Sequence, residues 1–181
     1  MIIAHLPAGY LCSRLLCGRF KRYGCSRRAF IAAGMLGSIA PDLDMLYFHL
    51  VDGRQHHHHT YWSHYPVVWI VVLGAMTLWL LRASRQSFPA LGVVFAINGM
   101  LHLLLDSIVG DIWWFAPWVD RSYALFTVPS LYKPWWVNFL LHWSFALEIG
   151  VVLWAGVLLW HSRTAAGGMQ QTTRIYGEFW H

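Results

Sequence analysis

His102 and Asp106 lie four residues apart in an apolar run from Phe88 to Val109, with only leucines between them. Residues i and i+4 stack on one face of an α-helix, so the imidazole and the carboxylate would reach the same point in space. An unpaired carboxylate in hydrocarbon costs roughly 2.5 to 3.5 kcal/mol on insertion scales, so a buried Asp106 needs a partner. A metal ion or a buried cation would supply one.

A second acidic motif places Asp42 and Asp44 directly after Pro41. Two carboxylates two residues apart cannot share one helical face. One of them is predicted to be a metal ligand and the other a supporting or capping group. The alternative is an N-cap pair at the start of a helix, with no role in metal binding.

Histidines are concentrated in the run His56 to His59 and recur at His64. For His56 and His57 the simpler interpretation is solvation or adventitious metal binding. His59 and His64 are the predicted ligands, and His58 is the alternative to His59.

The last apolar stretch also carries two polar candidates, His142 and Glu148. They lie about 120° apart around a regular helix, so they would reach one ion together only if the helix were distorted. An intramembrane glutamate is a functional candidate by default. A core histidine bonded to a neighbouring carbonyl or hydroxyl is the alternative for His142.

The elements that must position these groups belong to a membrane protein. The chain has 181 residues, of which 57% are apolar and 12% charged, and it contains 12 tryptophans. A helix needs about 20 residues to cross a hydrocarbon core. The stretches long enough, or nearly so, are Ala29 to Val51, Pro66 to Leu81, Phe88 to Val109 and Trp135 to Trp160. We therefore predict an all-α, multi-pass bundle of about four spans plus an N-terminal helix, with residues 1–161 as one membrane-embedded domain and 162–181 as a polar, mobile tail.

The net charge of +5 is explained by the flanks of the spans. Basic residues precede the first span and follow the second, at Arg14, Arg19, Lys21, Arg22, Arg27, Arg28, Arg82 and Arg85. Loops 52–65 and 110–134 carry only Arg54, Arg121 and Lys133. The positive-inside rule then predicts cytoplasmic termini and outward-facing long loops. Without a recognition motif, the charge does not indicate nucleic-acid binding.

Depth in the bilayer supports one shared site. A helix rises 1.5 Å per residue, so the depth of a residue can be counted from the cytoplasmic end of its helix. By this count the polar residues lie about 18 to 27 Å above the cytoplasmic edge, in the outer leaflet. The residues counted are His5, Asp42, His64, His102, Asp106, His142 and Glu148.

These motifs together resemble a known family. The motifs concerned are His5, the segment from Gly37 to Asp44, His59-x4-His64, and Gly99 to Asp106 followed by Trp113, Trp114 and Pro117. Together they resemble the YdjM-type inner-membrane, metal-dependent hydrolases. That family is distantly similar to zinc-dependent phospholipase C and to single-strand nucleases of the same helical fold. The resemblance implies metal ligation by His5, Asp42 or Asp44, His59 or His64, His102 and Asp106. His142 and Glu148 resemble a His-x3-Glu ligand pair of the phospholipase relatives, with a spacing two residues longer, and form a second tier with His58.

Nitrogen and oxygen ligands without cysteine suit one or two divalent ions, Zn²⁺ above Mn²⁺ or Fe²⁺. The expected function is hydrolysis of a phosphoester or lipid-derived substrate at the outer leaflet of the inner membrane, with Asp42 or Asp44 accepting a proton from water. The alternatives are a non-catalytic protein that handles or senses zinc, haem binding by His102 and His142, and a purely structural His/Asp network. The sequence does not predict the oligomeric state.

Overall fold

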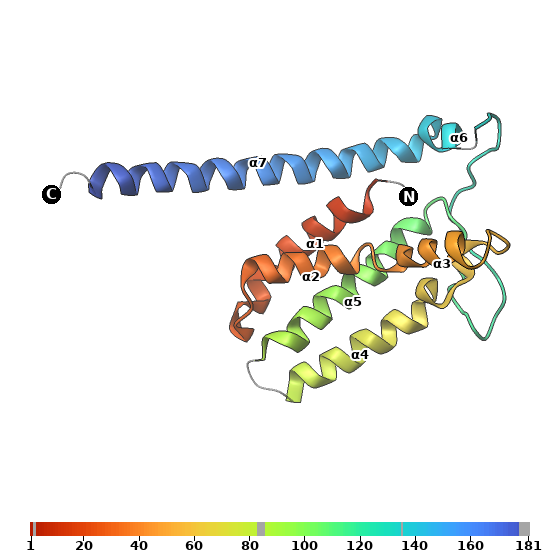
Figure 1. The fold of residues 1–181 in the computed structure, drawn as a ribbon, viewed down its shortest axis with the longest axis horizontal. Coiled ribbons are helices and arrows are strands. Elements are labelled where there is room, and N and C mark those ends of the chain that lie inside the picture. The colour runs from red at the N-terminus through yellow and green to blue at the C-terminus, as the bar shows by residue number, and fades with distance from the viewer. Residues whose placement is uncertain (2, 83–85, 135, 178–181) are drawn as a thin grey trace.

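The computed structural model describes residues 1, 3–82, 86–134 and 136–177, and it confirms the all-α class. The helices are α1 (His5–Phe20), α2 (Arg27–Gly37), α3 (Asp44–Leu50), α4 (Pro66–Arg82), α5 (Ser87–Asp106), α6 (Trp136–Leu141) and α7 (Trp143–Gly177) (Figure 1). Short 3-10 turns link several of them, namely η1 (Lys21–Tyr23), η2 (Pro41–Leu43), η3 (His58–Thr60) and η4 (Trp62–His64). In these ranges extended pairing is limited to one isolated bridge, between Ile112 and Tyr123.

The number of candidate membrane spans is smaller than expected. Ser87–Asp106 and Trp143–Thr164 are long and apolar enough to cross a membrane, and the bent pair Arg27–Gly37 and Pro41–Leu50 makes a third if it is one span. Pro66–Arg82 is apolar but has only 17 residues. The expectation of about four spans is therefore not confirmed, because the second stretch is one turn too short.

Two of the predicted spans are interrupted, the first at Pro41 and the last at His142. Pro41 lacks an N–H group, and the chain bends by 57° between α2 and the segment that follows it. The predicted continuous span Trp135 to Trp160 is divided at His142, whose Nδ1 lies 2.9 Å from Ser144 Oγ and accepts the Ser144 N–H at 3.4 Å. Trp135 and Arg85 lie outside the described residues.

The end of the chain was predicted to be a polar tail from residue 162. The backbone stays helical to Gly177, and residues 178–181 lie outside the described part of the chain. The boundary between the domain and the tail stays a prediction.

The packing of α2 against α5 depends on small residues. A Cβ atom added at Gly37 would lie 2.1 Å from the Phe95 carbonyl oxygen, and one at Gly34 would lie 1.8 Å from Ser13 Oγ of α1. Such contacts require glycine, as in other closely crossing helices of membrane proteins. α2 therefore lies close enough to α5 for backbone groups of one helix to reach side chains of the other.

Apolar contacts attach the remaining helices. Trp69 of α4 packs with Leu103 of α5 and with Ile112 of the long loop that follows α5. α7 packs on α1 through Ala155, Tyr10 and Leu11, and it extends well beyond the other helices (Figure 1). The start of α1, the bend after α2 and the end of α5 lie at the same end of the bundle, where the histidine-rich segment also lies (Figure 1).

Replacing Gly37 by alanine should destabilise the protein by about 1 to 3 kcal/mol, because the new methyl group meets a backbone carbonyl that cannot move aside. Gly74→Ala is the matched control, since nothing lies within 4 Å of a Cβ at that position of α4. The control should be neutral, or stabilising by up to about 1 kcal/mol through helix propensity. The midpoint of thermal unfolding in detergent measures both, and equal midpoints would contradict the close crossing.

Candidate metal centre

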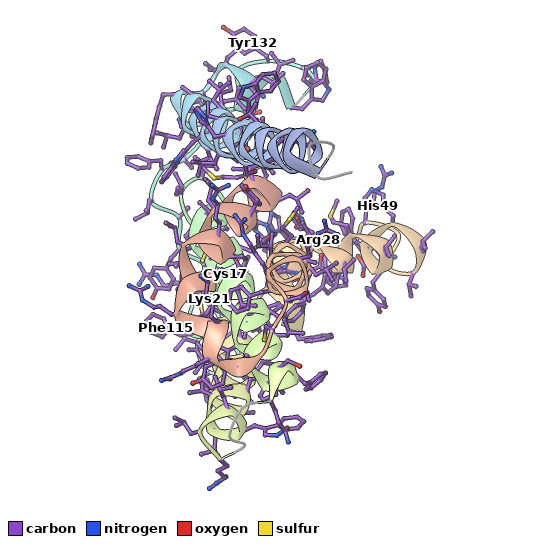
Figure 2. The ribbon with its side chains drawn as sticks, turned by 90° about the vertical axis from the view of Figure 1, so that its left-hand side faces the viewer. Cys17, Lys21, Arg28, His49, Phe115 and Tyr132 are labelled. Carbon is purple, nitrogen blue, oxygen red and sulfur yellow. The ribbon has the colours of Figure 1, made fainter. Side chains whose placement is uncertain are left out.

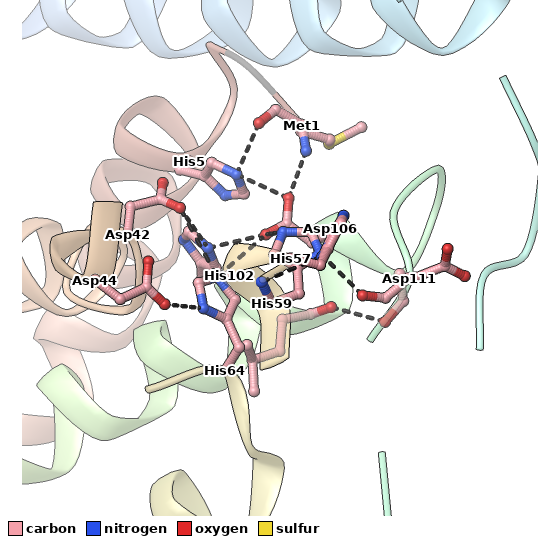
Figure 3. A network of polar contacts seen from close by, with 12 residues as sticks. Met1, His5, Asp42, Asp44, His57, His59, His64, His102, Asp106 and Asp111 are labelled. Atoms are coloured by element: carbon pink, nitrogen blue, oxygen red, sulfur yellow. Dashed lines mark hydrogen bonds and ion pairs between the residues drawn. The ribbon is translucent and has the colours of Figure 1, made fainter. Parts of the chain in front are cut away.

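Four side chains converge at the end of the bundle. Asp42, His64, His102 and Asp106 each offer a ligand atom, and these atoms all lie within 4.8 Å of one another. They come from η2, η4 and the last turn of α5. Figure 3 shows the group together with the residues that contact it.

His102 and Asp106 lie on one face of α5, as expected. His102 Nε2 is 2.9 Å from Asp106 Oδ2 and 3.5 Å from Asp42 Oδ1. His102 is fully buried, and Asp106 is 3% exposed.

A backbone carbonyl sets the tautomer of His102. Its Nδ1 lies 2.8 Å from the carbonyl oxygen of Ser38. Ser38 caps the end of α2, where carbonyl groups have no partner within the helix. A carbonyl can only accept, so Nδ1–H donates to it, and in the neutral ring the Nε2 lone pair points at the carboxylates.

His64 is oriented in the same way by Asp44. The His64 Nδ1–H donates to Asp44 Oδ2 over 2.6 Å, and Ser63 Oγ donates to the same oxygen, also over 2.6 Å. His64 Nε2 then faces Asp42 Oδ1 at 3.8 Å and Asp106 Oδ2 at 4.0 Å. This is the carboxylate–histidine arrangement that commonly supports metal ligands. Asp44 thus lies behind His64, outside the group of four.

His59 borders the group without belonging to it. Its Nδ1–H donates to the Asp111 carbonyl oxygen over 2.9 Å, and its Nε2 lies 3.7 Å from Asp106 Oδ2. Burial lowers the pKa of His59 to about 2. The ring is therefore neutral near pH 7, with its Nε2 lone pair directed at the centre.

His5 approaches Asp106 from the opposite side. His5 Nε2 is 3.1 Å from Asp106 Oδ1, and its ring stacks on His102 with 3.8 Å between the ring centroids. The amino group of Met1 forms an ion pair with the same Asp106 oxygen. The two oxygens of Asp106 therefore face different partners.

Of the second-tier residues, only His58 has a ring contact with a member of the group of four among the contacts described. The His58 ring lies 4.1 Å from His59 and 5.6 Å from His64, between ring centroids. His142 contacts Ser144 and Trp143. Neither His142 nor Glu148 lies in the group of four.

Glu148 instead contacts the start of α1. It accepts the backbone N–H groups of Ile3 and Ala4, over 2.6 and 3.2 Å. It thereby fixes the segment that carries His5.

Sequence reasoning missed the backbone acceptors. The carbonyl groups of Ser38 and Asp111 orient two of the rings, yet no side-chain pattern distinguishes them. Only the Ser38 carbonyl could have been suspected from the sequence. A helix that ends shortly before Pro41 leaves its last carbonyl groups without partners inside the helix.

The donor set fits a divalent cation. The Nε2 atoms of His64 and His102 are buried and have no hydrogen-bond partner in the described part of the chain. Their nearest polar neighbours include carboxylate oxygens of Asp42 and Asp106. Lone pairs that face anionic oxygens repel one another unless a cation lies between them.

Comparison with known proteins gives one match. The model of the family described as YdjM inner membrane protein matches residues 1–172. No curated protein and no solved structure matches the chain.

The Asp44→Asn variant tests the support of His64. The amide has the shape of the carboxylate but holds the Nδ1–H less strongly, so Zn²⁺ affinity should fall by about 10- to 100-fold. Asp120→Asn is the matched control, because Asp120 is exposed and bonds only the Trp113 indole among the contacts described. Competition with a chelator of known affinity measures both. Equal affinities would mean that Asp44 does not support a metal ligand.

Proposed function

The chain belongs to the YdjM inner membrane protein family, and from that membership and the buried His/Asp group we propose that it is a membrane-bound, metal-dependent hydrolase. The observation that carries the proposal is the pair of buried Nε2 atoms, His64 and His102, that face the carboxylates of Asp42 and Asp106. Pure stability would not favour this arrangement, since a purely apolar core avoids the desolvation of the Asp106 carboxylate.

One or two divalent ions, Zn²⁺ above Mn²⁺ or Fe²⁺, are the proposed cofactor. Asp42, His64, His102 and Asp106 would hold the first ion, and neutral imidazole with carboxylate is a donor set that suits zinc. His59 and His5 adjoin Asp106 on different sides and are the candidates for completing a second position. Asp44 acts through His64.

The chemistry of hydrolysis divides between the metal and Asp42. A bound metal supplies Lewis acidity, which lowers the pKa of water and polarises a phosphoryl or acyl oxygen. The Asp42 side chain is 40% exposed, whereas that of Asp106 is 4% exposed. Asp42 is thus the carboxylate that water reaches. With Oδ1 directed at the centre, its other oxygen, Oδ2, can accept a proton from the attacking water.

An apolar cavity beside the centre supports a lipid-derived substrate. Its volume is about 1050 Å³, at the upper end of the range of about 300 to 1,000 Å³ that small-molecule sites occupy. Most of its lining is apolar and includes the aromatic residues Tyr47, Trp62 and Trp69. Its polar lining residues are Asp44, Asp52, His56, Thr60 and Ser63. Because Asp44 bonds His64 directly, a hydrocarbon chain in this cavity would lie one side chain away from the metal ligands.

Orientation in the membrane completes the proposal. Cytoplasmic termini, with the bent pair and α4 each crossing the membrane, would put the loops that carry His59, His64 and Trp118 on the outer side of the inner membrane. Trp118 is 76% exposed and Trp136 is 46% exposed, as befits aromatic residues at the level of the lipid headgroups. The substrate would then be a phosphoester or lipid of the outer leaflet.

A non-catalytic role in zinc handling is the second candidate. The observation that favours it is the set of histidine rings adjacent to the centre, which exceeds what a single hydrolytic ion needs. Both candidates require the same metal site and differ in turnover alone.

Metal content tests the site itself. The His102→Ala/Asp106→Asn double variant should contain much less zinc than the wild type after purification in detergent, because it loses two of the four ligand groups. His142→Ala/Asp120→Asn makes the same chemical changes outside the group and should keep its metal. Elemental analysis of all three proteins is the measurement, and equal metal content throughout would remove the site.

Turnover separates the two candidate functions. The zinc-loaded wild type should release phosphate or diacylglycerol from labelled phospholipids. This release should stop when a chelator removes the metal. Asp42→Asn should lower kcat by about 10²- to 10⁴-fold through loss of the proton acceptor, whereas Asp120→Asn should match the wild type. A metal-loaded protein inactive on every phospholipid class and on simple phosphoesters would be a zinc-handling protein.

A further inference from the structure

A row of histidine rings runs from the surface to the candidate metal centre. The distances between successive ring centroids are 5.1 Å from His57 to His58, 4.1 Å from His58 to His59 and 4.7 Å from His59 to His64. His64 is in turn 5.4 Å from His102. Figure 3 shows His57 and His59 beside the group that contains His64 and His102. Successive ring centroids in this row are therefore no more than 5.4 Å apart.

Burial increases steadily along the row. His57 is exposed and His58 is half-buried. His59 is 7% exposed, and His64 and His102 are fully buried. The row therefore connects solvent with the interior.

Local structure fixes the orientations of His57, His58 and His59, of which only His59 is buried. η3 begins at His58, and a 3-10 turn rotates successive side chains by about 120°. His59 is held by the Asp111 carbonyl, and the His57 ring lies 6.1 Å from the Trp113 ring.

Other histidines of the same region do not join the row. His56 pairs with Asp52 at 2.7 Å, and His49 bonds the carbonyl group of Met45. Figure 2 shows His49 at the outer side of α3, turned away from the other helices. A general tendency of histidines to cluster therefore does not account for the row.

A buried metal centre needs a route for loading. A divalent cation loses its water only where other ligands replace it, because a bare ion in a low-dielectric interior is very unfavourable. Neutral imidazoles can replace water one ligand at a time without adding charge to the interior.

We propose that His57 and His58 form an entry site that captures a divalent cation from solvent and passes it through His59 to the buried group. The inference rests on the metal centre of the proposed function and applies equally to a hydrolase and to a zinc-handling protein. His57 and His58 thereby act on the rate of metal exchange and not on the final affinity.

The test uses the full chain, purified in detergent and stripped of metal. It is mixed rapidly with Zn²⁺ held by a weak coloured chelator, and the loss of colour gives the rate of uptake. The variant is His57→Gln/His58→Gln, which keeps polar side chains of similar size. The control is His49→Gln/His161→Gln, which removes two exposed histidines outside the row. Thermal unfolding of each protein verifies that it is folded.

The entry-site variant should take up Zn²⁺ at least about tenfold more slowly than the wild type, with the control unchanged. Its rate of zinc release should fall by the same factor, and its affinity and final zinc content should equal those of the wild type, since a route changes both directions equally.

Equal uptake rates in all three proteins would overturn the route and would leave the exposed Asp42 as the entrance. A loss of affinity in the entry-site variant would also overturn it, by making His57 or His58 a ligand of the final site. No uptake by the wild type would instead remove the metal centre itself, and the route with it.

Discussion

The structure depends on the repulsion between two buried imidazole lone pairs and the carboxylates that face them. In their neutral form, His64 and His102 each donate the Nδ1–H group to a fixed acceptor, so the Nε2 lone pair faces the carboxylates of Asp42 and Asp106. Electron pairs that oppose each other in a low-dielectric interior are unfavourable without a positive charge between them. The same fixed protons that create this conflict make the site ready for a cation.

Backbone geometry maintains that arrangement. The carbonyl group that orients His102 is free because α2 ends there, and it is near enough because Gly37 lets α2 approach Phe95 of α5 closely. The bend at Pro41 then turns Asp42 back toward the end of α5. A helix end, a close crossing and a bend thus act together. The chain belongs to a family of inner membrane proteins, and lipid hydrocarbon offers no hydrogen-bond partner to polar groups such as these.

Much of this was visible in the sequence. The apolar stretches predicted an all-α membrane protein, and the i, i+4 spacing predicted that His102 and Asp106 share a face, because helical periodicity is a local property. Asp42 and His64 were also among the predicted ligands, and the structure brings them to the same point. The expected number of spans is not confirmed, because Pro66–Arg82 is too short to count as a span by length and hydropathy.

The tertiary structure decided the rest. Local patterns could not say which of Asp42 and Asp44 faces the centre, since that depends on the direction of the bend after α2. They could not show that Ser38 and Asp111 orient imidazoles, because every residue carries a carbonyl group and only packing makes one of them a partner. The sequence determined which chemical groups lie in an apolar chain and on which helical face. Which ring nitrogen carries the proton, and how far apart these groups lie, was decided by the tertiary structure, because hydrogen bonds between distant segments determine both.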